Sequence, residues 1–174
     1  MKYSIGLASL VLAVASVVSA PAQAAVEVNE VGANAVSLCQ GSLPVFETLL
    51  RKRPLAVQNE GSNNTFVTCS FSTQYDADDI FEIGYFGAFL NNIGTAPATV
   101  SCTGVAGFAS QGADTVYISK STIVPPGGEG FIFFTTVDNE GNGYYPLVNM
   151  NCHLPPGTGI TDTAVGFDVD DAAA

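Results

Sequence analysis

The sequence predicts an all-β protein, a single-domain antiparallel β-sandwich of immunoglobulin-like or jelly-roll-like type with at most one short helix. Two observations lead to this fold class. Apolar residues recur at every second position in several short runs, as in strands with one buried face and one solvated face. Clusters of Gly, Pro, Asn, Ser and Thr separate these runs at the intervals typical of a sandwich or barrel.

The first 24 residues have the layout of a secretory signal peptide. Lys2 is followed by an apolar run, Ile5–Val18, and by the small-residue cleavage site Ala22-Gln-Ala24. The apolar run is shorter than the roughly 20 residues that a membrane-spanning helix needs. We therefore expect cleavage near Ala25 and no stable membrane insertion afterwards.

About 150 residues then form one domain of ordinary size, which we place at residues 25–167. Residues 168–174 form an acidic, small-residue tail. The chain has 16 acidic and 5 basic residues, a net charge of −11. Such a field repels phosphate backbones and anionic lipid, so nucleic acid is excluded as a partner.

The clearest alternation runs from Val148 to Leu154. Its apolar face carries Val148, Met150, Cys152 and Leu154, and its polar face carries Asn149, Asn151 and His153. Phe66–Phe71 alternates in the same way, with Val67 and Cys69 facing inward. Further strands are expected at Thr99–Thr103, Thr115–Ser119, Gly130–Val137 and Thr163–Val169, and a longer one at Ile80–Leu90.

Two segments near the start of the domain need a separate interpretation. Leu43–Leu50 has room for one or more helical turns. The basic cluster Arg51-Lys52-Arg53 is interpreted as a solvated strand face whose cations pair with nearby carboxylates, rather than as a binding patch.

The segments LRKRPLAVQNEG, FVTCS, TVSCTG and NCHLPPGTGITD resemble a family of short exported, β-rich proteins of Gram-negative bacteria with two disulfides and no assigned activity. The resemblance covers most of the mature chain and rests on turns and cysteine-bearing strands. It implies the sandwich, export and two disulfides, and it carries over no catalytic or ligand-binding residue.

Four cysteines in an exported domain predict two disulfides, for which three pairings exist. Loop entropy does not choose between these pairings. Neighbouring strands tend to meet in space, and together with the family resemblance this favours Cys39–Cys69 and Cys102–Cys152.

The sequence contains no signature of catalysis. His153 is the only histidine, and no Gly-x-Ser-x-Gly elbow, zinc-ligand spacing or phosphate-binding loop is present. We therefore predict no catalytic residue and no cofactor. A small hydrolase that uses two carboxylates stays as an alternative.

The stretch DNEGNG partly matches a calcium loop. Asp138, Glu140 and Asn142 fall at ligand positions one, three and five, but Asn149 replaces the bidentate Glu at position twelve. An EF-hand is excluded, and a weak calcium site stays as an alternative. The favoured interpretation is a hairpin connection between Phe131–Val137 and Tyr144–Asn151. The acidic clusters at Asp76–Asp79 and Asp168–Asp171 are interpreted as solvated strand ends.

These expectations together describe an exported, non-catalytic binding or surface-interaction module, located in the periplasm or outside the cell. It is expected to be a monomer whose partner is an unknown protein or surface. A pilin-like or adhesin-like structural subunit is the alternative, because such subunits are also small, secreted, disulfide-bonded and β-rich.

Overall fold

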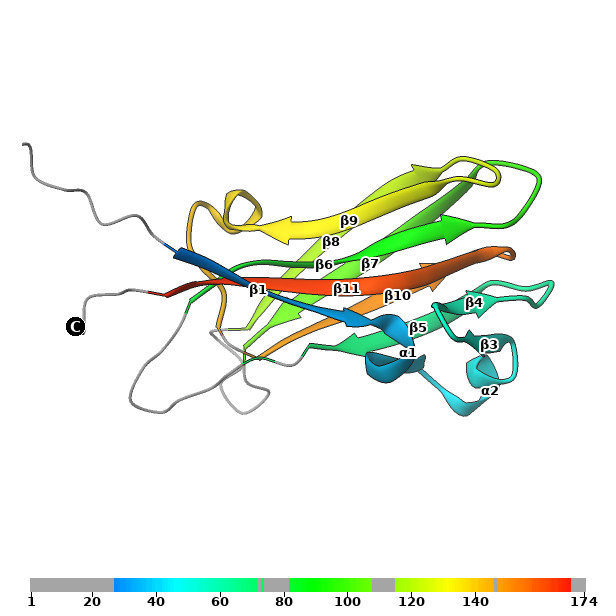
Figure 1. Cartoon of the computed structure of the whole chain (residues 1–174), viewed down its shortest axis with the longest axis horizontal. Coiled ribbons are helices and arrows are strands. Elements are labelled where there is room, and N and C mark those ends of the chain that lie inside the picture. Colours follow the sequence, from blue (N-terminus) through cyan, green and yellow to red (C-terminus); the bar gives the residue numbers. More distant parts are fainter. Residues whose placement is uncertain (1–26, 72, 74–81, 108–114, 146, 170–174) are drawn as a thin grey trace, which may run out of the picture.

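A computed structural model of the chain describes residues 27–71, 73, 82–107, 115–145 and 147–169, and it contains two antiparallel β-sheets packed face to face (Figure 1). The expected all-β sandwich is confirmed. The signal peptide, the Asp76–Asp79 cluster and the last five residues of the tail lie outside the described residues. Within the described residues, no helix has the length and apolar character needed to cross a membrane.

The first sheet contains β1 (Glu27–Asn34), β3 (Leu50–Arg53), β4 (Ala56–Asn59), β6 (Ile83–Asn92), β9 (Glu129–Thr135) and β11 (Thr158–Val169). The second sheet contains β2 (Cys39–Gly41), β5 (Thr65–Ser70), β7 (Ala98–Ala106), β8 (Val116–Val124) and β10 (Val148–Leu154). The helical segments are α1 (Ala35–Leu38), α2 (Pro44–Glu47) and the 3-10 turn η1 (Thr136–Asn139).

The strand order identifies the sandwich as a jelly roll. Four strands of the first sheet follow the order β4-β11-β6-β9, and four of the second follow β5-β10-β7-β8. From β4 onward the chain changes sheet at every connection except the one between β7 and β8. Such an eight-stranded, two-sheet path is the jelly-roll arrangement. Of the two sandwich types that the sequence left open, the immunoglobulin-like one is excluded.

The expected hairpin at Asp138–Gly143 is wrong. β9 pairs with β6 in the first sheet, whereas β10 pairs with β5 and β7 in the second. The loop therefore crosses between the sheets. It begins with η1 and turns at Glu140, whose φ of 56° is left-handed. Turn residues show that a strand ends, but they do not show which strand the chain pairs with next.

The limit of one short helix is also wrong, because the described residues contain two four-residue α-helices and η1. α2 lies within the expected segment Leu43–Leu50, while α1 had no sequence signal. The Asn34 side chain accepts a hydrogen bond from the Val36 amide at 3.0 Å and so caps α1. A single turn is too short to show a helical period.

Both disulfides have the expected pairing, and both lie within the second sheet. Cys39 is directly opposite Cys69 on β2 and β5, and Cys102 is directly opposite Cys152 on β7 and β10. All four cysteines are buried. Disulfides of this kind persist in oxidising compartments, which indicates a non-cytoplasmic protein.

Two asparagines organise the loops at the right-hand end of the molecule in Figure 1. Asn59 and Asn92 end β4 and β6 and are almost fully buried. Each accepts a hydrogen bond from the glycine amide two residues later, at 3.0 Å for Asn59 and 2.8 Å for Asn92. Each also donates to two carbonyls, one four residues later and one on a distant strand end, Leu154 or Val124.

Candidate functional site

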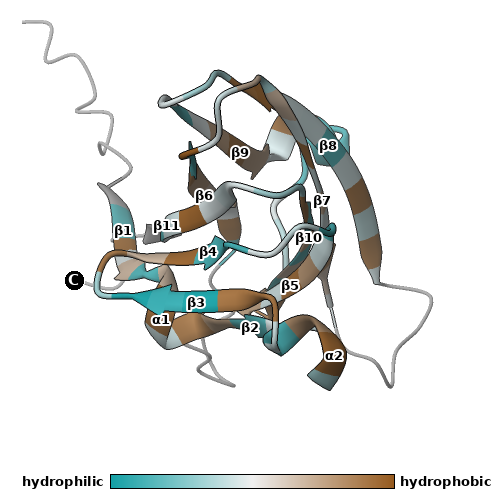
Figure 2. Cartoon of the chain, turned by 90° about the vertical axis from the view of Figure 1, so that its right-hand side faces the viewer, coloured by the Kyte–Doolittle hydropathy of each residue, from teal (hydrophilic) through white to brown (hydrophobic). Residues whose placement is uncertain are grey.

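The outer face of the first sheet carries a cluster of rings on β6 and β9, which we call the aromatic face: Tyr85, Phe89, Phe131 and Phe133. The ring of Phe133 lies 5.3 Å from that of Phe89, 5.9 Å from that of Tyr85 and 6.1 Å from that of Phe131, measured between centroids. Figure 2 shows β9 mostly brown, because it carries apolar side chains on both faces.

The aromatic face is open to solvent. Phe131 is 64% exposed and Phe89 is 44% exposed, although both belong to the most apolar class of side chain. Isolated exposed apolar residues need no explanation, but a contiguous group of them marks an interaction surface. The sequence pattern could not locate this group, because Phe131–Phe134 reads as a strand with two apolar faces.

Two glycines let the rings lie close to the sheet. A Cβ atom on Gly166 would lie 2.1 Å from the Tyr85 ring, and a Cβ atom on Gly87 would lie 2.6 Å from the Phe133 ring. Gly166 is opposite Tyr85 on β11, and Gly87 is opposite Phe133. A side chain at either position would collide with the ring, so glycine is needed for the rings to lie this close to the sheet.

Glu30 on β1 orients one edge of the aromatic face. The Tyr85 hydroxyl donates a hydrogen bond to the Glu30 carboxylate at 2.5 Å. Burial, followed by this hydrogen bond and the Glu30 charge, raises the pKa of Tyr85 to about 12. Tyr85 is consequently a neutral, hydrogen-bonded ring at every physiological pH.

A row of four polar residues and one glycine crosses the first sheet beside the rings, which we call the polar row: Arg51, Gln58, Gly159, Asn91 and Glu129. Strand pairing places these residues side by side from β3 through β4, β11 and β6 to β9. Asn91 comes two residues after Phe89, so both point outward from β6. The Asn91 side chain and the rings therefore lie on the same side of the first sheet, although Gln58 in the same row is buried.

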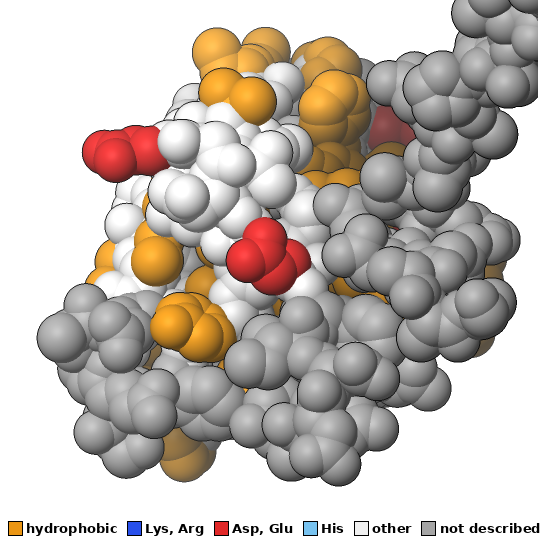
Figure 3. Space-filling model, turned by 90° about the vertical axis from the view of Figure 1, so that its left-hand side faces the viewer, with side chains coloured by type: hydrophobic (Ala, Val, Ile, Leu, Met, Phe, Trp, Pro, Cys, Tyr) orange, Lys and Arg blue, Asp and Glu red, His pale blue; other side chains and the backbone are white. Residues whose placement is uncertain are grey.

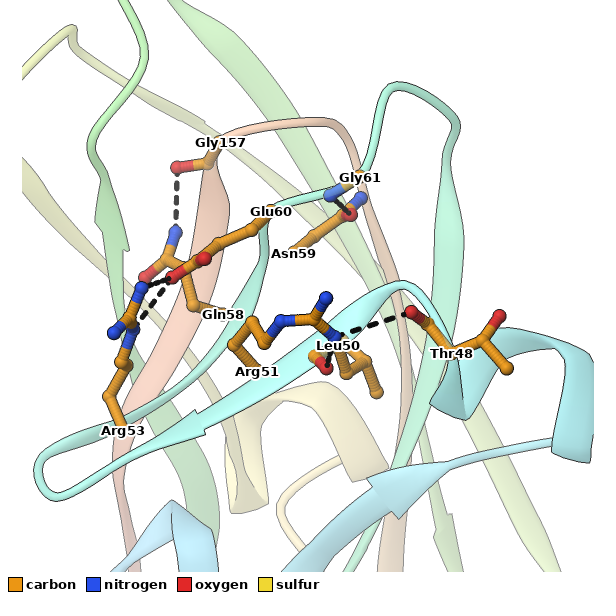
Figure 4. Close-up of polar contacts among 9 residues, drawn as sticks. All are labelled: Thr48, Leu50, Arg51, Arg53, Gln58, Asn59, Glu60, Gly61 and Gly157. Carbon is orange, nitrogen blue, oxygen red and sulfur yellow. Dashed lines mark hydrogen bonds and ion pairs between the residues drawn. The ribbon is translucent and has the colours of Figure 1, made fainter.

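Two of the three residues in the basic cluster Arg51-Lys52-Arg53 form ion pairs with carboxylates, as the sequence predicted. Lys52 contacts Glu47 at 3.6 Å. Arg53 contacts Glu60 at 2.5 Å, and Figure 4 shows this pair. Arg51 differs, since it donates to the backbone carbonyls of Thr48 and Leu50. Of the four cations in the described part of the chain, Arg51 alone forms no ion pair.

His153 lies at a groove of about 630 Å³ formed where three loops meet at the right-hand end of the molecule. Asn64, Thr95, Thr99, Pro155 and Pro156 also line this groove, and none of its lining residues carries a carboxylate. The ring of His153 packs against that of Phe66, with centroids 5.1 Å apart. Among the described residues that line this groove there is therefore no carboxylate to orient His153 as a general base.

The opposite end of the sandwich has a smaller hollow of about 390 Å³ beside η1, lined by Glu82, Asn139, Asn142 and Tyr144 among others. Figure 3 shows this end, where the coloured side chains in view are apolar or acidic. Tyr144 is buried and donates a hydrogen bond to the Thr135 carbonyl at 2.6 Å.

Asp138, the first residue of the candidate calcium loop, is engaged by protein groups. Its Oδ2 accepts hydrogen bonds from Lys120 at 2.6 Å and from the Thr135 amide at 2.7 Å. Burial alone would raise the pKa of Asp138, but these hydrogen bonds outweigh it and the pKa is lowered. Lys120 also donates to the Phe133 carbonyl, so it ties β8 to β9.

The other two candidate ligands of this loop, Glu140 and Asn142, are exposed. The Asn142 side chain donates to the Asn139 carbonyl at 3.0 Å. Across the described residues, no group of three or more His, Cys, Asp or Glu side chains is placed to hold a metal ion.

Millimolar calcium is expected to leave the melting temperature unchanged, because the Asp138 carboxylate is already neutralised by Lys120. The measurement is thermal unfolding with calcium and with a chelator. Asp138→Ala should lower the melting temperature equally in both conditions, since it removes a structural ion pair. A calcium-dependent rise that this variant abolishes would show a calcium site instead.

Raising the pH from 10 to 12 is expected to destabilise the fold. Burial, assisted by the Asp138 charge, raises the pKa of Tyr144 to about 12. A tyrosine in the unfolded chain ionises near 10, so the unfolded state loses its proton first. Stability that is complete below pH 10 is therefore lost as the pH rises toward 12, by roughly 2–3 kcal/mol for this group.

Urea unfolding at each pH measures this loss. Tyr144→Phe should weaken the pH dependence, while the matched variant Tyr117→Phe should not, because Tyr117 is 70% exposed. An equal effect of the two variants would contradict the assignment to Tyr144.

Comparisons with known proteins give fold likeness alone. No family model matches the sequence, and no curated protein matches it. An exo-beta-1,3-galactanase from Phanerochaete chrysosporium aligns over 79% of this chain at 10% identity, with a TM-score of 0.41. A GH26-CBM35 beta-(1,4)-mannanase from Podospora anserina aligns over 83% at 9% identity, with a TM-score of 0.38.

A third solved structure, TmCBM61 in complex with beta-1,4-galactotriose, aligns over 80% of this chain and 84% of its own, at 7% identity and a TM-score of 0.34. The chain spans 29% of the length of each of the first two structures.

Proposed function

We propose that the protein is a non-catalytic binding module of the periplasm or the cell exterior, and that it binds a neutral carbohydrate chain on the aromatic face. The observation that carries this proposal is the group of four rings on a solvent-facing sheet, two of them seated on glycines. Rigid aromatic side chains supply a large contact area at a small cost in conformational entropy.

The chemistry of the surface supports a neutral carbohydrate. Ring faces pack against the apolar C–H face of a sugar, and a polar side chain beside the rings, such as that of the exposed Glu129, can hydrogen-bond its hydroxyl groups. Binding sites commonly combine an apolar platform with a few fixed polar groups in this way. The net charge of −11 disfavours anionic chains.

A structural subunit assembled by donor strands is less well supported. β1 pairs over all eight of its residues with β11 of the same chain, so this terminal strand is already used. We expect a lasting monomer in size-exclusion chromatography, and a concentration-dependent series of larger species would instead favour the subunit alternative.

Phe131→Ala is expected to weaken carbohydrate binding at least tenfold, because it removes the most exposed ring of the aromatic face. The measurement is affinity gel electrophoresis with soluble hydroxyethyl cellulose, laminarin and galactomannan. Tyr117→Ala is the matched control, since Tyr117 is as exposed as Phe131 but lies in the second sheet.

Retention of the wild-type protein by at least one polysaccharide, lost in Phe131→Ala and kept in Tyr117→Ala, would support the aromatic face. Retention by none of them, or equal loss in both variants, would overturn the proposal.

A further inference from the structure

The groove at His153 has a shape that is fixed before any ligand binds. The Gly157 amide donates a hydrogen bond to the Asn59 carbonyl at 2.9 Å, and the Gly157 carbonyl accepts one from the Ile93 amide at 2.8 Å. One residue therefore joins the three loops that form the groove. The buried side chains of Asn59 and Asn92 add hydrogen bonds inside two of these loops. A ligand thus meets a preformed site, which lowers the entropic cost of binding.

The groove lies on the opposite side of the sandwich from the aromatic face. His153 and Thr99 occupy outward positions of β10 and β7 in the second sheet, whereas the aromatic face belongs to the first. The volume of about 630 Å³ falls within the range of roughly 300–1,000 Å³ that is common for small-molecule sites. The two candidate sites therefore share no residue.

The lining of the groove contains no Asp, Glu, Lys or Arg side chain, although the chain has a net charge of −11. A charged ligand group that entered the groove would lose its hydration without gaining an ion pair, which costs free energy. The part of a ligand that enters the groove is therefore neutral.

Neutral hydrogen-bonding groups line the groove beside apolar ones. The side chains of Asn64, Thr95 and Thr99 make no hydrogen bond to another described residue, so their amide and hydroxyl groups are available to a ligand. Pro97, Pro155, Pro156 and two alanines supply C–H surface. A sugar carries hydroxyl groups around its rim and C–H groups on its faces, so it matches this combination.

An extended peptide fits the groove less well. Such a peptide is bound by pairing with free backbone groups or by pockets for its apolar side chains. The Gly157 carbonyl already accepts two hydrogen bonds, from the Ile93 amide and from the Gln58 side chain, at 2.8 Å each. The apolar lining consists of alanines and prolines, which form no deep apolar pocket.

We infer that this groove is a second carbohydrate site, which binds a short neutral oligosaccharide. The inference goes beyond the proposed function, because a sugar can bind in the groove whether or not a chain binds on the aromatic face. β10 lies between β5 and β7 in the sheet. Asn64, just before β5, and Thr99, near the start of β7, therefore lie on either side of His153, where both can reach one sugar.

His153 provides a local readout, because it is the only histidine of the chain. The proton NMR spectrum of the protein without a histidine tag contains one imidazole Hε1 signal, which needs no assignment. Titration with cellobiose, laminaribiose and mannobiose at constant pH should shift this signal to saturation with at least one of them.

Asn64→Ala should weaken this binding about fivefold, as expected for the loss of one hydrogen bond. Asn64 is exposed, so the variant should keep the fold. Phe131→Ala is the matched control, and it should bind the disaccharide with wild-type affinity because Phe131 lies on the aromatic face.

A His153 signal that no disaccharide shifts, or wild-type affinity of Asn64→Ala, would overturn the inference. A shift caused by an uncharged, proline-containing tripeptide amide and by no sugar would also overturn it. In each case the proposed function would stand if Phe131→Ala still lost retention by the polysaccharides. A saturable shift in a protein that no polysaccharide retains would support the groove and overturn the aromatic face.

Discussion

The double variant Cys102→Ala/Cys152→Ala should lose about 4 kcal/mol of unfolding free energy. The bond closes a loop with a sequence separation of 50 residues. In the chain-entropy model, its removal raises the conformational entropy of the unfolded chain and so lowers the free energy of unfolding by roughly this amount. It also joins β7 to β10 at the centre of the second sheet. Urea unfolding under non-reducing conditions measures the loss.

Cys39→Ala/Cys69→Ala is the matched comparison. Its sequence separation is 30 residues, so the same model gives a similar loss of about 4 kcal/mol. Non-reducing peptide mapping of the wild-type protein should yield both disulfide-linked peptides. A free thiol, or a Cys102→Ala/Cys152→Ala variant as stable as the wild type, would contradict this account.

Asn92→Ala should lower the unfolding free energy by about 3 kcal/mol. The side chain makes three hydrogen bonds, to the Gly94 amide and to the carbonyls of Ala96 and Val124. Removing it leaves buried polar groups without partners, and each such group costs about 1–3 kcal/mol unless water reaches it. Asn59→Ala should behave alike, because Asn59 makes the equivalent three bonds.

Asn64→Ala is the control for these two variants, since Asn64 lies in the same group of loops but is exposed. Its unfolding free energy should stay within about 0.5 kcal/mol of the wild type. If all three variants were equally stable, the buried asparagines would have no special role in the loops.

Strands with one buried face were predictable from the sequence because their period is two. β10 has the expected burial, with Val148, Met150, Cys152 and Leu154 all buried. β4 was not predictable, because all four of its residues are buried, including Gln58 and Asn59. Polar residues in a buried strand give no periodic signal, since tertiary hydrogen bonds and not hydropathy decide their place.

The candidate site was largely hidden for a different reason. Phe89 and Phe131 are far apart in the sequence and become neighbours only through the pairing of β6 with β9.

The sequence did contain one signal for the loops that Asn59 and Asn92 organise. Asn59-Glu-Gly61 and Asn92-Ile-Gly94 repeat the same Asn-x-Gly spacing at the ends of two strands. Such a repeat could have indicated two equivalent turns, but nothing in it shows that both asparagines are buried.

The pairing of β1 with β11 determines how the protein responds to a pulling force. Glu27 is opposite Val169, so the chain enters and leaves the first sheet at adjacent points (Figure 1). Tension between these points loads the ladder one residue pair at a time, because antiparallel hydrogen bonds run perpendicular to the strands. β1 would therefore peel away at low force, and the disulfide-linked second sheet would not bear the load.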